Sequence, residues 1–197
     1  MIKKIVVLGP ESTGKSTLCA QLADHYKTGW VKEYAREYLL ANGTAYTFDN
    51  LLDIAKGQLA LEDAAIPCPG AGLQHSDPES SKSLHSQTCA KNPELIFIDT
   101  NMYVLKVWCE FVFGKCHRWI LDQIAERKYD LYLLCDIDLP WVKDELREYP
   151  DLETRQILYH HYKEIMVNQT VPWVNINGNY EARLQKAMEA VNALLLC

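Results

Sequence analysis

Eight residues near the start of the chain have the composition of a phosphate-binding loop. The octet Gly-Pro-Glu-Ser-Thr-Gly-Lys-Ser begins at Gly9 and matches the P-loop pattern G-x-x-x-x-G-K-[ST]. Gly9 and Gly14 permit a tight turn whose backbone N–H groups surround phosphate oxygens, Lys15 reaches the β- and γ-phosphates, and the Ser16 hydroxyl binds Mg²⁺. The octet therefore predicts a site for ATP and Mg²⁺. The residues expected to contact the nucleotide are Gly9, Glu11, Ser12, Thr13, Gly14, Lys15, Ser16 and Thr17.

An aspartate at the end of a later apolar run is the second candidate for this site. Asp99 follows the run Leu95–Ile98, which is the Walker B pattern of a strand that ends in a carboxylate. Such a carboxylate lies beside a P-loop and holds Mg²⁺, so Ser16 and Asp99 are the predicted metal ligands. The alternative is that Asp99 caps a helix beginning near Asn101, and the two roles are compatible.

A charged segment after the second apolar run is the candidate acceptor site. Glu33 could accept a proton from a substrate hydroxyl, and Arg36, one helical turn later, could steady a phosphate or the base. The alternative is a solvated face of ion pairs, each worth little. Spacing alone leaves both interpretations open.

Residues 136–151 follow the fourth apolar run, contain two prolines and are predicted to form a lid. A helix expected near residues 140–148 would place Lys143 and Arg147 on one face, where they could neutralise charge on a transferred phosphoryl group. Arg155, on the next expected helix, is a further candidate. Ordinary pairing of Lys143 and Arg147 with nearby acids is the alternative.

The elements that would position these residues alternate along the chain. Apolar runs predict strands, and they are separated by segments with helical periodicity, which is typical of a parallel sheet covered on both faces. We therefore expect an α/β fold of the P-loop NTPase type, with three layers, about five parallel strands flanked by helices, and a helical lid. The predicted strands are 3–8, 29–33, 95–99, 131–135 and 172–176, and the predicted helices are about 15–26, 34–42, 47–61, 101–113, 117–127, 140–148, 151–168 and 179–196.

One segment of the chain departs from this alternation. Residues 66–93 are rich in Pro, Gly and Ser and have no hydrophobic period. We expect a flexible or disordered insertion within a single domain of residues 1–197, and we do not expect the active site there.

Composition and charge exclude several classes of protein. A chain of 197 residues with 48% hydrophobic content suits one α/β domain. A net charge of −6 disfavours nucleic acid as a partner. No apolar run approaches the ~20 residues of a membrane span, and the N-terminal residues lead directly into a strand instead of resembling a signal peptide. We expect a cytoplasmic protein with a small-molecule partner.

Cysteine and histidine do not form a metal-binding pattern. The seven cysteines lack C-x-x-C spacing and are interpreted as scattered cytosolic thiols. The Cys116-His117 pair has no second pair of ligands, and His75 and His85 lie in the atypical segment.

Several motifs together resemble a known family. The segments 9–17, 31–38, 99–104, 106–108 and 138–147 are similar to the ATP-binding, ribosylnicotinamide kinase domain of NadR-type proteins, in the NadR/Ttd14-like P-loop family. The resemblance covers nearly the whole chain except residues 66–93. It implies a compact P-loop kinase fold with a lid, and transfer of the ATP γ-phosphate to the 5′-hydroxyl of nicotinamide riboside in NAD salvage.

The candidate residues together give a hypothesis for the mechanism. Glu33 is the first candidate for the base, and Asp99 is the alternative. Arg147, helped by Lys143 or Arg155, would close over the γ-phosphate. The loop at residues 177–179 would border the adenine. The candidates for an aromatic wall around the acceptor are Tyr34, Tyr103, Trp108 and Trp141.

Two departures and two alternatives accompany this resemblance. The P-loop begins at residue 9, so we expect neither the adenylyltransferase domain nor the DNA-binding domain of longer family members. The segment 66–93 could alter the acceptor site. The chain could instead be a kinase for another nucleoside or vitamin, or a nucleotide-dependent binding or switch ATPase without a small acceptor. The oligomeric state stays open.

Overall fold

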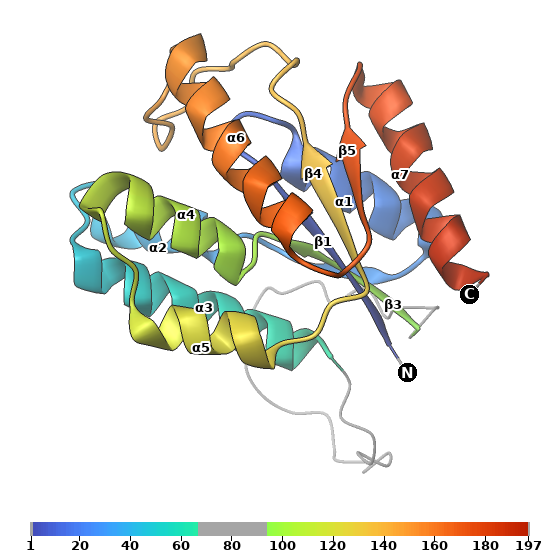
Figure 1. Cartoon of the computed structure of the whole chain (residues 1–197), viewed down its shortest axis with the longest axis horizontal. Helices are drawn as coiled ribbons and strands as arrows, with labels where there is room; N and C mark the ends of the chain where they lie inside the picture. The colour runs from blue at the N-terminus through green and yellow to red at the C-terminus, as the bar shows by residue number, and fades with distance from the viewer. Residues whose placement is uncertain (1, 67–93, 197) are drawn as a thin grey trace, which may run out of the picture.

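Five short apolar segments pair into one parallel sheet, as the sequence predicted (Figure 1). The computed structural model describes residues 2–66 and 94–196. The strand order is β2-β3-β1-β4-β5, so β1 is central and pairs with β3 and β4. The strands are β1 (Lys3–Leu8), β2 (Gly29–Val31), β3 (Leu95–Asp99), β4 (Leu131–Cys135) and β5 (Trp173–Ile176).

Helices cover both faces of this sheet and complete the three layers. Helices α1 and α7 lie together on one face, whereas the helices from α2 to α6 lie on the other (Figure 1). The helices of the described residues are α1 (Lys15–Tyr26), α2 (Tyr34–Asn42), α3 (Phe48–Ala65), α4 (Met102–Phe113), α5 (Arg118–Glu126), α6 (Leu152–Asn168) and α7 (Tyr180–Leu195). The expected insertion at residues 66–93 lies, from residue 67 onward, outside the described part, and a single domain of residues 1–197 stays a prediction.

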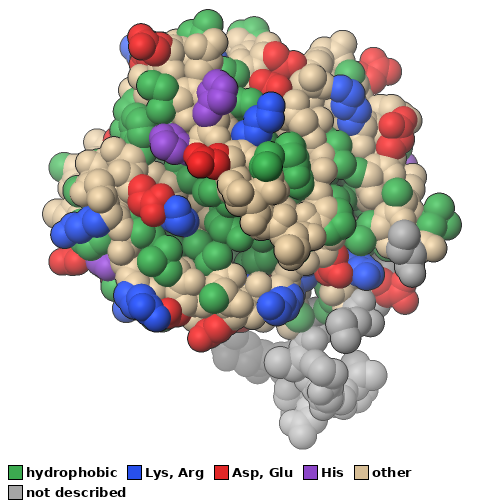
Figure 2. Space-filling model, in the orientation of Figure 1, with side chains coloured by type: hydrophobic (Ala, Val, Ile, Leu, Met, Phe, Trp, Pro, Cys, Tyr) green, Lys and Arg blue, Asp and Glu red, His purple; other side chains and the backbone are tan. Residues whose placement is uncertain are grey.

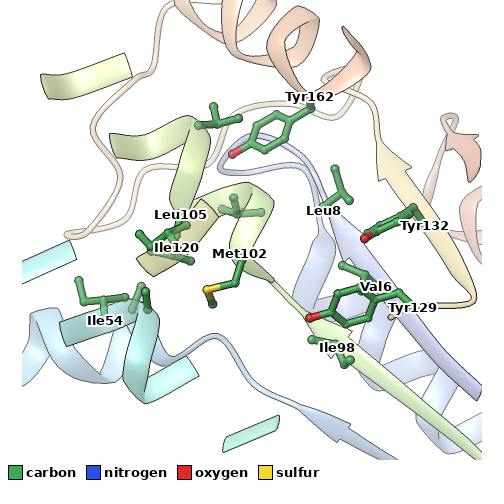
Figure 3. Packing of buried hydrophobic residues seen from close by; sticks show 14 of the residues in the cluster. Val6, Leu8, Ile54, Ile98, Met102, Leu105, Ile120, Tyr129, Tyr132 and Tyr162 are labelled. Carbon is green, nitrogen blue, oxygen red and sulfur yellow. The ribbon is translucent and has the colours of Figure 1, made fainter. Parts of the chain in front are cut away.

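The alternation of side chains along β1 divides the core into two clusters. Val6 and Leu8 belong to the cluster under α3, α4, α5 and α6, whereas Ile5 and Val7 belong to the cluster under α1 and α7. Figure 3 shows the first cluster, in which Val6 and Leu8 lie near side chains from β3, β4 and α6. All four side chains are fully buried, which explains why the strand is continuously apolar.

Polar side chains define where the helices begin. Thr47 and Asn50 form a capping box at the start of α3. The Oδ1 atom of Asn101 accepts a hydrogen bond from the backbone N–H of Tyr103, 3.1 Å away, and caps α4. The alternative in which Asp99 caps this helix is therefore wrong, and the Asp99 carboxylate is available for the site.

The helix expected near residues 140–148 does not form. This segment is irregular, with one turn around Glu145 and Leu146. The Asp144 carboxylate accepts from the backbone N–H of Leu146 at 3.1 Å, a local bond that competes with helical pairing, and the segment lies between Pro140 and Pro150. Lys143 and Arg147 consequently do not share a helical face, and the prediction that they do is wrong.

A glycine of α3, Gly57, leaves room for the ring of Tyr34, the first residue of α2. A Cβ atom added at Gly57 would lie 2.0 Å from the ring of Tyr34, the residue after Glu33. Gly57→Ala should lower the free energy of unfolding by about 1–2 kcal/mol, because overpacking outweighs the better helix propensity of alanine. Urea denaturation measures this change. Gly29→Ala is the control, since its Cβ would meet nothing within 4 Å; equal effects of the two substitutions would contradict the prediction.

Candidate active site

The P-loop joins β1 to α1 in a turn that only particular residues permit. Gly9 has a φ of 138° and Gly14 a φ of 79°, and a Cβ atom at Gly9 would lie 2.7 Å from the carbonyl oxygen of Cys135. Ser12 also has a positive φ, 57°. The close approach to β4 explains why the first position of the octet is glycine.

The lysine of the loop, Lys15, is buried. Lys15 is 9% exposed, and its Nζ atom donates to the carbonyl oxygen of Pro10 at 2.9 Å. The ammonium group is thus kept within the loop by a neutral acceptor, which phosphate oxygens can replace because they bind a cation more strongly.

Ser16 and Asp99 meet where β3 ends beside β1. Asp99 pairs in register with Val7, and its Oδ2 atom accepts from the Ser16 hydroxyl at 2.5 Å. A hydroxyl and a carboxylate oxygen beside a phosphate-binding lysine are the donors that Mg²⁺ prefers. The residues therefore fit the metal, and they are the pair that the sequence predicted.

Burial and a neighbouring charge shift the titration of Asp99. The side chain is fully buried, and desolvation, reinforced by the negative charge of Glu33, raises its pKa from 3.8 to about 6. Lys15 and the hydroxyl of Ser16 oppose this shift by favouring the charged form. An added cation would favour the ionised carboxylate in the same way.

A cavity of about 250 Å³ joins the P-loop to the candidate acceptor residues. Residues of the P-loop line one side, and Glu33, Trp108 and Arg147 contribute to the others. An apolar wall completes it, formed by Ala35, Leu39, Val104, Val107, Phe111 and Leu158. The cavity is thus lined by the P-loop in one part and by aromatic and apolar side chains in another.

Glu33 is placed at this cavity by the start of α2. It occupies the N-cap position with an extended backbone, φ −65° and ψ 115°, but its side chain makes no capping hydrogen bond. The half-buried side chain lines the cavity, and its role as a base stays a prediction.

Arg36 pairs with an acid in this structure, and its predicted contact with a phosphate or with the base stays a prediction. Its guanidinium makes two parallel hydrogen bonds to the Asp144 carboxylate, at 3.0 and 3.2 Å, and thus connects α2 to the segment predicted as a lid. Arg36 still lines the cavity.

A hydrogen-bonded chain connects the aromatic wall to the same segment. The indole N–H of Trp108 donates to the Tyr46 hydroxyl at 2.9 Å, and that hydroxyl donates to the Glu148 carboxylate at 2.9 Å. Burial and Glu148 raise the pKa of Tyr46. Trp108 was predicted from sequence, whereas Tyr46 was missed because it lies in a connection between helices without a recognisable motif.

Three aromatic candidates do not line the cavity. Tyr34 packs its ring over Gly57, and Tyr103 packs edge-to-face on Tyr132 with ring centroids 5.7 Å apart. The indole N–H of Trp141 instead donates to Glu11 at 3.3 Å. The prediction that Tyr34, Tyr103 and Trp141 line the cavity is therefore wrong, because each of these rings packs or bonds elsewhere.

The predicted lid cations occupy three different environments. Arg147 lines the cavity, and its guanidinium donates to the carbonyl oxygen of Val142. Lys143 is exposed and does not line the cavity. Arg155 is 5% exposed, and its Nη2 atom donates to the carbonyl oxygens of Ile137 and Leu139. The lid role predicted for Arg155 is therefore wrong, because this side chain supports the start of the segment instead of the cavity.

Sequence reasoning missed Arg183, which ties the P-loop to two neighbouring loops. This side chain of α7 is 2% exposed, donates to the carbonyl oxygens of Thr13, Asp136 and Gly178, and pairs with the Asp138 carboxylate. An arginine in an amphipathic helix has no distinguishing signal. The loop at residues 177–179 does not line the cavity, so its contact with adenine stays a prediction.

The described residues contain no group of three or more side chains suited to a transition metal, and His117 instead stacks on Phe48. His75 and His85 lie outside the described part.

Among residues 2–66 and 94–196 no helix has the length and apolar character needed to cross a membrane. Figure 2 shows basic side chains interspersed with acidic ones on the face drawn there.

Comparisons with known proteins agree with this geometry. The model of the AAA_28 family, described as an AAA domain, matches residues 4–183. The trifunctional NAD biosynthesis/regulator protein NadR of Salmonella typhimurium is 25% identical over 199 residues, which cover 98% of this chain and 43% of that protein. The chain therefore spans less than half the length of this curated relative.

Solved structures show the same fold. A structure described as NadR protein in complex with NR superposes with a TM-score of 0.69 at 21% identity, covering 98% of this chain and 49% of that one. Deoxyadenosine kinase from M. mycoides superposes with a TM-score of 0.59 at 14% identity, covering 96% and 99%. This chain therefore shares its fold with these P-loop proteins.

The raised pKa of Asp99 predicts how stability depends on pH. Because the folded pKa of about 6 exceeds the ordinary 3.8, the contribution of Asp99 to stability is present below pH 3.8 and is lost as the pH rises through 6. Asp99→Asn should therefore gain about 2–3 kcal/mol of unfolding free energy relative to wild type between pH ~4 and ~8, measured by urea denaturation without nucleotide. Asp53→Asn, on the surface, is the control for losing one carboxylate. A pH-independent difference between Asp99→Asn and wild type would contradict the prediction.

Proposed function

We propose that this chain, which belongs to the AAA_28 family of AAA domains, is a kinase that transfers the γ-phosphate of ATP to the 5′-hydroxyl of nicotinamide riboside. The observation that carries the proposal is the single cavity in which Lys15 of the P-loop, the Glu33 carboxylate and the Trp108 ring meet. A donor site, a base and an aromatic acceptor wall are the parts that a small-molecule kinase needs, whereas a switch ATPase needs only the first.

The donor half of the site is formed by the P-loop. The backbone N–H groups and Lys15 would bind the phosphates of ATP, and Arg147 lines the same cavity. Ser16 and Asp99 would hold Mg²⁺, which, when bound, neutralises charge on the β- and γ-oxygens. Two positive groups at this cavity would favour a transition state with charge spread over the phosphoryl oxygens.

The acceptor half suits a cationic aromatic ring. Trp108 and Phe111 offer aromatic surface, and a pyridinium ring over an aromatic face is attracted to it. Glu33 and Glu148 add negative charge at the cavity. This combination supports nicotinamide riboside over a neutral nucleoside. The name of the NadR structure in complex with NR points to the same ligand class.

The reaction follows from this arrangement. The 5′-hydroxyl oxygen forms a bond to the γ-phosphorus while the bond between that phosphorus and the β–γ bridging oxygen breaks, and ADP leaves. Glu33 accepts the hydroxyl proton, because its carboxylate is at the cavity and makes no competing cap bond. The product is nicotinamide mononucleotide.

Removing the base should affect turnover and spare nucleotide binding. Glu33→Gln is expected to lower kcat by about a hundredfold and to leave the Kd for ATP within about twofold, because general-base catalysis supplies an effect of that size. A coupled assay for ADP and calorimetry with ATP measure the two quantities. Glu37→Gln, an exposed acid on the same helix, is the control. Equal kcat values for Glu33→Gln and wild type would show that Glu33 is not the base.

A panel of candidate acceptors tested with ATP identifies the substrate that is phosphorylated. Nicotinamide riboside, neutral nucleosides and vitamins with a primary hydroxyl are each incubated with ATP and Mg²⁺, and the products are identified by mass spectrometry. We expect the highest kcat/KM for nicotinamide riboside. A nucleoside kinase of different specificity would phosphorylate another member of the panel and leave nicotinamide riboside unchanged, and a switch ATPase would phosphorylate none.

The aromatic wall predicts a selective change in affinity. Trp108→Leu should raise the KM for the acceptor about tenfold or more while the KM for ATP stays within about twofold, because only the acceptor ring would lie on the indole. Trp108→Phe retains an aromatic face but loses the hydrogen bond to Tyr46, so it separates stacking from that bond. An acceptor KM unchanged in Trp108→Leu would place the acceptor elsewhere.

A further inference from the structure

A glutamate of the P-loop is bonded to the segment that carries Arg147. The Oε1 atom of Glu11 accepts from the backbone N–H of Tyr149 at 2.6 Å and from the indole N–H of Trp141 at 3.3 Å, and its Oε2 atom accepts from the backbone N–H of Glu148 at 3.0 Å. The variable position of a P-loop does not need an acid, because phosphate binding uses the backbone and the lysine. A negative charge there even opposes phosphate binding, so the residue calls for a different role.

The neighbouring P-loop residue holds the other end of the same segment. The Ser12 hydroxyl oxygen accepts from the backbone N–H of Val142 at 3.0 Å. Arg147 lies between the two attachment points, and its guanidinium donates to the carbonyl oxygen of Val142. The P-loop therefore holds residues 142–149 as a closed loop that presents Arg147 to the cavity.

The acceptor side of the cavity holds this loop as well. Asp144 pairs with Arg36 of α2, and Glu148 accepts from Tyr46, which in turn accepts from Trp108. A loop attached to both halves of the site can transmit a change at one half to the other.

We propose that Glu11 is a positioning residue that fixes Arg147 for phosphoryl transfer by holding residues 141–149 against the P-loop. When the ATP phosphates bind, they restrict the motion of the P-loop, and the hydrogen bonds of Glu11 to Trp141, Glu148 and Tyr149 restrict the motion of the segment that carries Arg147. The inference rests on the proposed function only in that the chain transfers the γ-phosphate of ATP; the contacts of Glu11 exist regardless of the acceptor.

The chemistry of a carboxylate makes this role specific. Both oxygens of Glu11 accept from N–H groups, and a carboxylate can accept at both oxygens whereas an amide cannot. In Glu11→Gln an NH₂ group must face at least one of these N–H donors. In Glu11→Asp both acceptors remain, but the shorter side chain cannot reach as far. Glu11→Gln therefore changes the hydrogen-bond pattern at nearly constant side-chain volume. Glu11→Asp shortens the side chain at constant charge.

The first experiment measures turnover. Glu11→Gln should lower kcat about tenfold or more, the size expected for losing hydrogen bonds to a charged group, while the KM for ATP changes less than about threefold. Glu11→Asp should lie between Glu11→Gln and wild type. Glu145→Gln is the matched control, because Glu145 is an exposed acid of the same segment that does not line the cavity. A loss of ATP affinity as large as the loss of kcat would overturn the proposal, since Glu11 would then act on the nucleotide.

The second experiment tests whether Glu11 acts through Arg147. Arg147→Met should lower kcat, and adding Glu11→Gln to it should lower kcat by less than about twofold more, since residues that act as a unit are non-additive. Effects that multiply fully in the double variant would contradict the proposal.

The third experiment does not depend on any acceptor. Hydrogen exchange of a peptide containing residues 142–149 is measured with and without Mg²⁺ and a non-hydrolysable ATP analogue. In wild type and in Glu145→Gln the analogue should slow exchange at the amides of Glu148 and Tyr149, and in Glu11→Gln it should not. If wild type phosphorylates no acceptor, the proposed function fails and this readout still decides the role of Glu11. Slowing of exchange by the analogue in Glu11→Gln that is as large as in wild type overturns that role.

Discussion

The parallel pairing of β1 with β3 and β4 is the constraint on which the rest of the structure depends. It brings the end of β1, where the P-loop begins, beside Asp99 at the end of β3 and against Cys135 at the end of β4. The carboxyl ends of parallel strands open at one edge of the sheet, so the loops that follow them share one space. Fully buried side chains on both faces of β1 hold this edge in place, because moving the strand would open cavities in two clusters.

Electrostatics at this edge favours a ligand with both cationic and anionic parts. Asp99 is buried near Glu33, which is unfavourable without a cation and raises its pKa, while Lys15 bonds to a backbone carbonyl instead of an acid. The site thus contains a hydroxyl and a buried carboxylate suited to a metal, Ser16 and Asp99, and a lysine suited to phosphate. Mg²⁺ would balance the negative charge of the acids, and the phosphates of ATP would balance the positive charge of Lys15 and Arg147. This is a physical reason for Mg²⁺ and ATP to bind together.

Local signals predicted most elements, and tertiary contacts explain the failures. The helix bounds of α2 and α4 followed from Gly43 and Gly114, and both are glycines with positive φ after the last turn. Residues 140–148 have helical composition, but Glu11 accepts from the backbone N–H groups of Glu148 and Tyr149, and Asp144 accepts from that of Leu146. These bonds come partly from residues more than a hundred positions away, which no window of sequence includes.

The sequence by itself determined the P-loop end of the cavity: the octet at Gly9, the meeting of Ser16 with Asp99, and the apolar strands that place them. These features follow from local backbone geometry and from the short-range periodicity of apolar residues, and both depend on residues that are close together in the sequence. Only the tertiary structure decided which side chains meet beyond the phosphates. It selected Trp108 over Tyr34 and Tyr103, paired Arg36 with Asp144, and gave Arg155 and Arg183 supporting positions. The reason is that a side chain's partner depends on how whole helices pack on the sheet, and packing joins residues that are distant in the chain.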